Sequence, residues 1–325
     1  MMNHHTDSPL ISFIITCYNT PIQMLKECID SVLALPLHDA EREIIVVDDG
    51  SASSSASHLE AYKDRISYVY KENGGASTAR NMGMEMAKGE YVQLIDGDDK
   101  LTKDTYEHCI DIIRQQGVDA VLFDFSQTNN HNTRFSDSPI MTGAEYMANH
   151  NLLGTIWSMV FRRSILGNLR FTPGIVCVED EEFKPLLVVR ARTLVHTDAQ
   201  AYFYRENTDS TSHQLSMDRV MQRIYDMEHI AVHLNAVAQK QPVAERTALN
   251  RRVAQLTMDH LYNVITLTQS KKQLFDAVER LRSNGLFPLP KKDYTLKYKW
   301  FRRLSNSPLG LHLLYFIALH SKAER

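Results

Sequence analysis

Short apolar runs alternate with helical stretches over the first 125 residues of the chain. The runs are ISFIIT, EIIVVD, ISYVY, YVQLID and DAVLFDF. Helical spacing begins after the first run, with Thr20 as the predicted N-cap residue and Pro21 in the first turn, and recurs near 53–64, 76–88 and 102–116. Continuous apolar strands joined by helices are typical of a mainly parallel sheet covered on both faces. We therefore predict an α/β fold, in which ligands bind at the carboxyl ends of the strands.

The rest of the chain has a different character. Residues 126–142 are polar and aperiodic, which predicts a loop, and the pattern is mixed from 143 to about 214. Long helical stretches follow, near 215–239, 244–268 and 271–284. The sequence thus predicts an α/β domain over 1–214 and a helical C-terminal region over 215–325.

Composition excludes several classes of protein. The 36 Lys and Arg nearly balance 39 Asp and Glu, whereas a protein that coats nucleic acid is usually basic. The longest apolar run, Leu309–Leu319, is shorter than the ~20 residues of a membrane-spanning helix. The N-terminus MMNHHTDSP lacks a secretory pattern, and the four cysteines stand singly. We expect a cytoplasmic protein with reduced thiols that binds no nucleic acid.

Polar side chains follow three of the predicted strands. The first strand ends in TCYN, the second in DDGS and the fourth in DGDD. One such segment is readily explained by turn formation. Three at one edge of a sheet favour a binding site, since clustered carboxylates repel one another unless a cation or hydrogen-bond donors compensate.

Asp96 and Asp98 have the spacing at which two oxygen ligands can face one Mg²⁺ or Mn²⁺ ion. Magnesium is usually held by one or two carboxylates together with phosphate oxygens of a substrate. The triplet alone occurs by chance in many proteins. Its position after an apolar strand that follows NGGASTARNMG makes a divalent-cation site the favoured interpretation.

Four segments carry a specific resemblance. FIITCYNTP, EIIVVDDGS, ENGGASTARNMGMEMAKGEYVQLIDGDD and VEDEEF resemble the family 2 glycosyltransferases with the GT-A fold, and are similar to bacterial capsular, exopolysaccharide and lipopolysaccharide sugar transferases. Neither GxGxxG nor GxxxxGK[ST] occurs to support another nucleotide-binding fold. The resemblance implies that 1–214 is a catalytic domain, with a nucleotide-binding half over 10–100 and an acceptor half over 101–214.

The resemblance also implies a nucleotide site. Tyr18 would stack on the base, and Asp49, or Asp48 in its place, would accept a hydrogen bond from it. Arg80 would contact the nucleotide or its phosphates, although a solvated helix face is an equal alternative. The implied nucleotide-binding residues are Thr16, Tyr18, Asn19, Asp48, Asp49, Gly74, Gly75, Arg80 and Asp96.

A catalytic base and a metal ligand follow from the same resemblance. Asp180 matches the carboxylate that takes the acceptor's proton in inverting members, with Glu179 as the second candidate. An acidic helix N-terminus is the structural alternative, and both can hold together. Asp98 would bind Mn²⁺ or Mg²⁺ directly, with Asp96 in the ligand shell or on the ribose.

The acceptor side is less defined. Glu179, Trp157, Arg205 and His213 are candidates for contacts with the acceptor or the diphosphate, with packing or surface exposure as the alternative for the last three. The expected donor is a UDP-sugar, and the expected acceptor is a hydroxyl of a glycan or lipid-linked molecule in surface polysaccharide synthesis. A non-catalytic nucleotide-sugar-binding module and a sugar-phosphate nucleotidyltransferase remain as alternatives.

The C-terminal segment 291–319 combines basic and apolar residues. Residues 291–303 hold six Lys or Arg and one Asp, and LGLHLLYFIAL follows. This pattern is typical of peripheral attachment to anionic lipid, and equally of a helix packed on the protein with solvated basic residues. The sequence does not indicate an oligomeric state.

Overall fold

The computed structural model describes residues 8–128, 131–206, 216–292 and 294–320. The chain divides into two compact units: Met1–Tyr146 with Leu153–Ser210, and Met147–Leu152 with Thr211–Arg325. The predicted boundary between 214 and 215 falls outside the described residues. The division into a catalytic domain and a helical region at that point, and the two halves of the former, therefore stay predictions.

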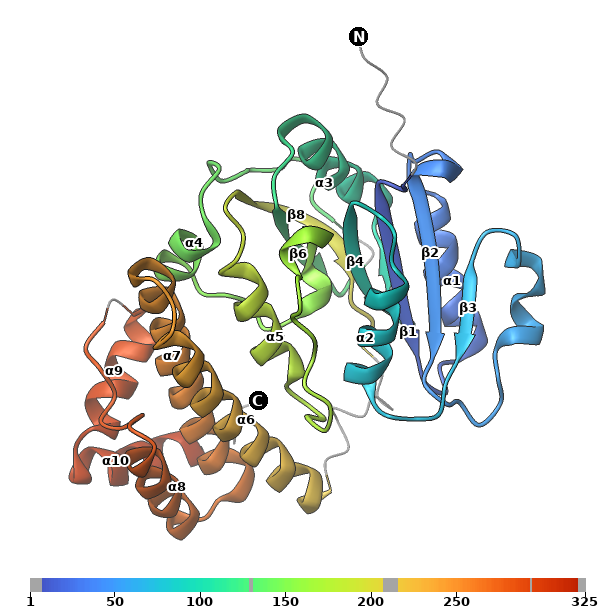
Figure 1. Ribbon diagram of the computed structural model, residues 1–325. Helices are drawn as coiled ribbons and strands as arrows, with labels where there is room; N and C mark the ends of the chain where they lie inside the picture. The colour runs from blue at the N-terminus through green and yellow to red at the C-terminus, as the bar shows by residue number, and fades with distance from the viewer. Residues whose placement is uncertain (1–7, 129–130, 207–215, 293, 321–325) are drawn as a thin grey trace. The chain divides into compact units, whose positions relative to one another are not determined.

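One eight-stranded sheet forms the centre of the first unit, counted over the residues described (Figure 1). Its order is β3-β2-β1-β4-β7-β6-β8-β5. Strands β3, β2, β1 and β4 are parallel, as are β6 and β8, whereas β7 is antiparallel to both of its neighbours and β5 to β8. The α/β prediction is confirmed, with a more mixed sheet than expected. The strands are β1 (Ile11–Cys17), β2 (Arg42–Asp48), β3 (Ser67–Tyr70), β4 (Tyr91–Asp96), β5 (Lys100–Leu101), β6 (Ala120–Ser126), β7 (Met159–Arg162) and β8 (Leu194–Phe203).

Helices cover both faces of this sheet. Leu25 of α1 belongs to the core around Phe13, and Tyr106 of α3 also packs on Phe13. Helix α2 covers the other face, where Gly83 lacks the side chain that would collide with Ile14. Figure 1 shows α1 and α2 on opposite faces of β1 and β2. The helices of this unit are α1 (Ile22–Leu33), α2 (Ala76–Met86), α3 (Lys103–Gln116) and α5 (Glu179–Val188), and the division between the two units falls within α4 (Gly143–Asn149).

Two local predictions were wrong. Helix α1 has Pro21 as its N-cap residue with no side-chain cap, so Thr20 does not cap it. The stretch 53–64 forms the 3₁₀ helix η2 (Ala56–Tyr62) and no α-helix. Further short 3₁₀ helices are η1 (Asp39–Glu41), η3 (Ile156–Ser158) and η4 (Arg163–Ile165).

The second unit is helical, and its three predicted long helices are confirmed. Helix α7 packs against α6, α8, α9 and α10. Arg280 of α8 donates three hydrogen bonds to the carboxylate of Glu228 in α6, at 2.8, 2.9 and 3.1 Å. No helix in the described part of the chain has the length and apolar character needed to cross a membrane. The helices are α6 (Met217–Ala238), α7 (Val243–Thr268), α8 (Lys271–Ser283), α9 (Leu296–Ser305) and α10 (Pro308–His320).

Candidate active site

Three carboxylates converge on the buried guanidinium group of Arg80 in α2. Arg80 donates to Asp96 at the end of β4, at 3.0 Å. It also donates to Glu179 at 2.9 Å and to Asp180 at 3.0 Å, both in the first turn of α5. Burial disfavours the charged guanidinium, but the three carboxylates outweigh it and raise the pKa of Arg80. A solvated helix face for Arg80 is therefore wrong, while its contact with a nucleotide stays a prediction.

The environment of Asp180 suits a group that accepts a proton. Its Oδ1 faces Arg80, and its Oδ2 accepts the backbone N–H of Ile156 at 2.8 Å. Burial raises the pKa of Asp180 to about 7, against the opposing charge of Arg80 and with the support of Glu179. The side chain keeps 15% exposure, and each carboxylate oxygen has a second lone pair. Asp180 is thus poised to bind a proton near neutral pH.

The carboxylate of Asp48 at the end of β2 is held inside the protein. Its Oδ1 accepts the Ser51 N–H at 2.9 Å, and its Oδ2 accepts the Tyr68 hydroxyl at 2.6 Å. Burial raises the pKa of Asp48, but these hydrogen bonds outweigh it and leave the pKa below its usual value. Asp48 therefore fixes the turn that follows β2.

Asp49 instead holds the glycine loop before α2. Its carboxylate accepts the N–H groups of Gly74 at 3.1 Å and Gly75 at 2.8 Å, and pairs with Lys71 at 2.5 Å. Gly75 has a φ of 86°, which favours glycine, and both glycines are exposed. Of the Asp48–Asp49 doublet, Asp49 is the residue in contact with the loop that the resemblance assigns to the nucleotide.

The end of β1 leaves an aromatic ring open to solvent. Asn19 connects this end to the turn after β2, since its N–H donates to Ser51 Oγ at 2.8 Å. Thr16 connects it to the DGDD loop, since its carbonyl accepts the Gly97 N–H at 2.8 Å. Between them the Tyr18 side chain is 53% exposed and available for stacking.

Tyr202 of β8 holds the DGDD loop through two hydrogen bonds of its hydroxyl group. Its buried hydroxyl donates to Asp99 at 2.8 Å and accepts the Asp96 N–H at 3.2 Å. The Arg205 N–H also donates to Asp99, at 2.7 Å. Burial, reinforced by the charge of Asp96, raises the pKa of Asp99 to about 8. Asp99 is a buried anchor of the loop, a role that sequence reasoning missed because its partners come about 100 residues later.

Comparisons with known proteins decide the family. The model described as glycosyl transferase family 2 matches residues 12–172. EpsJ of Bacillus subtilis, described as an uncharacterized glycosyltransferase, is 31% identical over 236 residues, which are 67% of this chain and 68% of EpsJ. The chain belongs to glycosyl transferase family 2. The minor teichoic acid biosynthesis protein GgaB of B. subtilis is 27% identical over 223 residues, 65% of this chain but only 24% of GgaB.

The solved structures agree on the fold of this glycosyltransferase. Residues 1–349 of TarS from S. aureus, crystallised with UDP-GlcNAc, superpose with a TM-score of 0.72 at 19% identity. The superposition covers 97% of this chain and 91% of that one. The GT-A fold expected from the resemblance is confirmed.

The carboxylates after β4 fit a divalent cation bound together with a diphosphate. Asp96 and Asp98 are partly exposed and offer hard oxygen donors, whereas Asp99 is committed to Tyr202. Nowhere in the residues described do three or more His, Cys, Asp or Glu side chains gather so as to hold a metal by themselves. A sparse protein ligand set is normal for Mg²⁺ with phosphate ligands. Cation binding by Asp96 and Asp98 stays a prediction.

Replacing Tyr202 by phenylalanine should lower the apparent Mn²⁺ affinity of the glycosyltransferase about 10–100-fold. The reason is that the DGDD loop loses a hydrogen bond that positions its carboxylates. It should also destabilise the protein by ~1–3 kcal/mol, since Asp99 loses a buried partner. The matched control is Tyr106→Phe, which removes an equally buried hydroxyl from Gln93. Urea unfolding measures the stability of the two variants, and Mn²⁺ titration of donor hydrolysis measures their apparent Mn²⁺ affinity. The same apparent Mn²⁺ affinity in Tyr202→Phe and Tyr106→Phe would contradict the assigned role.

The candidate residues for the acceptor side lie in different environments. Trp157 is buried and stacks on Tyr202, with ring centroids 4.2 Å apart. Arg205 donates to the Asp98 carbonyl and to the Glu27 carboxylate, both at 2.8 Å. His213 lies outside the described residues. Contacts of Trp157, Arg205 and Glu179 with an acceptor or diphosphate stay predictions.

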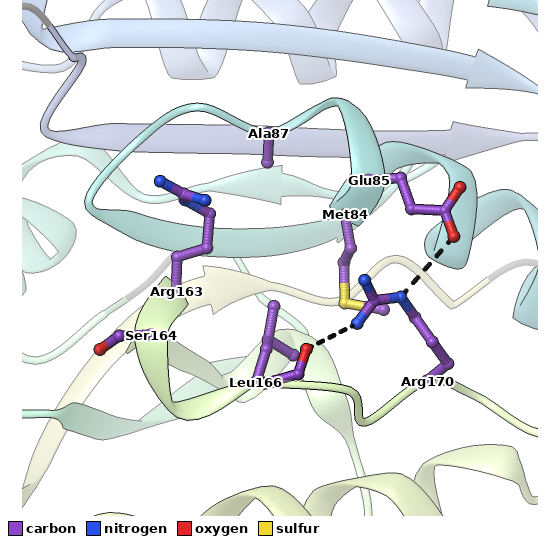
Figure 2. A pocket seen from close by; sticks show the side chains of 8 residues that line it. Met84, Glu85, Ala87, Arg163, Ser164, Leu166 and Arg170 are labelled. Carbon is purple, nitrogen blue, oxygen red and sulfur yellow. Dashed lines mark hydrogen bonds and ion pairs between the residues drawn. The ribbon is translucent and has the colours of Figure 1, made fainter.

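A separate crevice of about 350 Å³ lies near the start of β4, and Figure 2 shows it. Arg170 faces Glu85 there, with Nε 3.7 Å from the carboxylate, and Arg163 lines the other side. Met84 and Ala87, also in its lining, precede β4, so the crevice is at the amino end of the parallel strands. It is therefore at the opposite edge of the sheet from the carboxylate cluster.

Proposed function

We propose that this glycosyltransferase moves a sugar, with inversion, from a UDP-linked donor to a hydroxyl of a glycan or lipid-linked acceptor in surface polysaccharide synthesis. The UDP-GlcNAc complex of TarS supports the donor class. The name of GgaB, a teichoic acid biosynthesis protein, supports the acceptor class. A cytoplasmic location, where the chain would meet its donor, belongs to the same proposal.

The observation that carries the proposal is the cluster on Arg80. It brings the predicted donor-side carboxylate Asp96 and the predicted base Asp180 onto one guanidinium, although 84 residues separate them in the sequence. A sugar transfer needs donor and acceptor groups side by side, because orientation of the reactants supplies much of the rate.

Each residue then has a defined task. Tyr18 stacks on the base. Asp49 holds the glycine loop that borders the nucleotide, since its two carboxylate oxygens already accept four hydrogen bonds. Asp96 and Asp98 would hold Mn²⁺ or Mg²⁺, and the bound cation would supply positive charge to offset the charge on the departing nucleoside diphosphate. Asp180 takes the proton of the acceptor hydroxyl as its oxygen attacks the anomeric carbon.

A donor-hydrolysis screen tests the proposal. Wild-type protein is incubated with UDP-, GDP- and dTDP-sugars, with and without Mn²⁺, and free nucleoside diphosphate is measured. We expect Mn²⁺-dependent release from one UDP-sugar. In Asp98→Ala the apparent Mn²⁺ affinity should fall at least about tenfold, since a direct ligand contributes no less than an outer-shell partner.

The matched control is Asp111→Ala, which removes an exposed carboxylate from α3 and should leave Mn²⁺ dependence unchanged. Equal Mn²⁺ dependence in wild type and Asp98→Ala would contradict the metal assignment. If no donor is hydrolysed, calorimetric titration with UDP and Mn²⁺ follows, and absence of binding there would contradict the donor class.

A further inference from the structure

Helix α10 presents an apolar face to solvent. Its exposed residues are Leu309, Leu313, Phe316 and Ile317, with side chains from 51% to 82% exposed. Their spacing of four, seven and eight residues places them on one side of the helix. The opposite side, with Leu311, Leu314 and Ala318, is buried in the helical unit. Packing on the protein is thus confirmed for one face of α10, while the residues of the other face are exposed.

The preceding helix also exposes apolar side chains. Leu296 and Trp300 of α9 are 75% and 57% exposed. Arg303, one turn further along the same side, lies with its guanidinium 5.3 Å from the Trp300 ring centroid. Because α9 packs directly against α10, the two helices place large apolar side chains next to basic ones. Trp with flanking Lys and Arg is typical of side chains at a bilayer interface.

Charge is distributed very unevenly along the chain. Residues 270–325 contain twelve Lys and Arg against four Asp and Glu, a net charge of +8, whereas the whole chain is −3. The other residues therefore carry −11. A basic segment of this kind is attracted to anionic lipid headgroups, and the attraction is strongest within a Debye length of the surface.

We propose that α9 and α10 form a membrane-docking surface that lies in the interface of an anionic bilayer. The apolar residues of α10 with Leu296 and Trp300 enter the headgroup region, and the basic residues of 291–303 bind the anionic headgroups. A second copy of this chain is a poorer occupant, because two surfaces of the same positive charge repel each other. Docking would place the proposed glycosyltransferase at a membrane, and no step of sugar transfer depends on it.

Flotation with lipid vesicles tests the surface. Full-length wild type is mixed with vesicles of phosphatidylcholine alone or with one quarter phosphatidylglycerol. We expect binding to the anionic vesicles, weakened by 0.5 M NaCl. Leu313→Glu with Phe316→Glu should lower the partition coefficient at least about tenfold, because two apolar side chains no longer enter the interface.

The matched control is Met217→Glu with Val243→Glu, which places the same two charges at exposed apolar positions of α6 and α7. Val243 begins α7, about 39 Å along that helix from Gln269, which contacts Tyr315 of α10. This variant should bind vesicles like wild type. Thermal unfolding of all three proteins reports whether each is folded. Donor hydrolysis by the same proteins tests the proposed function separately from membrane docking.

Three outcomes would overturn the proposal. Wild type could fail to bind anionic vesicles, or both double variants could bind equally. Sedimentation could instead show a dimer that Leu313→Glu with Phe316→Glu dissociates, with no vesicle binding by either protein. The last result would assign the surface to a second copy of the chain.

Discussion

Replacing Arg80 by methionine should destabilise the α/β unit by ~3–5 kcal/mol and abolish sugar transfer, because it breaks a buried ion cluster from one side only. Methionine keeps an apolar stem of similar length beside Phe171, whose ring centroid lies 5.4 Å from the guanidinium carbon. What is lost is the positive charge, so Asp96, Glu179 and Asp180 are left facing one another. Urea unfolding at pH 7.5 measures the free energy, and donor hydrolysis measures the activity.

The pH dependence of this destabilisation separates charge from packing. Arg80 opposes the rise that burial causes in the pKa of Asp180, so its loss should raise that pKa further above the unfolded value. The lost stability is then fully present at high pH and shrinks as pH falls towards ~4, where the carboxylates of the unfolded chain also begin to bind protons. Arg170→Met is the control, since Arg170 is partly exposed and pairs loosely with Glu85, an interaction worth ~0–1 kcal/mol. A loss in Arg80→Met that matches this control, or that persists at pH 4, would contradict the assigned role.

The sequence predicted the carboxylates of this site but not their counter-charge. Asp96 follows an apolar strand, and Asp180 begins an acidic helix, so local pattern placed both. Their contact with Arg80 depends on α2 and α5 covering the same face of the sheet. No local signal specifies this, because the pairs are separated by 16 and 100 residues in the sequence.

The doublet Asp48–Asp49 shows a second limit of sequence reasoning. Asp48 is the last residue of β2 and its carboxylate turns inward, whereas Asp49 follows the strand and its carboxylate turns towards the glycine loop. Which one turns inward depends on the register of β2, in which Asp48 pairs with Cys17 of β1. The helix predicted at 53–64 failed for a different reason. Its first residues are mostly serine, whose side chains compete with helical backbone hydrogen bonds.

The antiparallel direction of β7 also could not be predicted from the sequence. A four-residue apolar strand carries no signal for parallel or antiparallel pairing, and the connection before it includes the mixed stretch after 143. The long helices α6, α7 and α8 were predicted correctly because helical periodicity accumulates over many turns. Element type is therefore well determined where the pattern is long, and topology is determined by contacts that only the fold supplies.

Asp180→Asn should lower kcat about 10²–10⁴-fold, because the amide keeps the shape of the side chain but cannot accept the acceptor's proton. Donor binding should change little, so UDP affinity by calorimetry is the internal control. Glu179→Gln is the matched comparison, since Glu179 shares the Arg80 nitrogen but is the second candidate for the base. A large loss in Glu179→Gln with near-normal Asp180→Asn would transfer the role to Glu179.

The pH profile of wild type should carry the signature of Asp180. Burial raises the pKa of this carboxyl to about 7, and only its ionised form can take a proton. We therefore expect kcat/KM to fall about tenfold per pH unit below pH 7 and to level off above it. Asp99 also titrates near neutrality, with a pKa of about 8, so Asp99→Asn is the necessary control. The fall of kcat/KM at low pH should keep its midpoint in Asp99→Asn and should be absent from the residual activity of Asp180→Asn. If the midpoint shifts in Asp99→Asn instead, pH acts on the DGDD loop and not on the base.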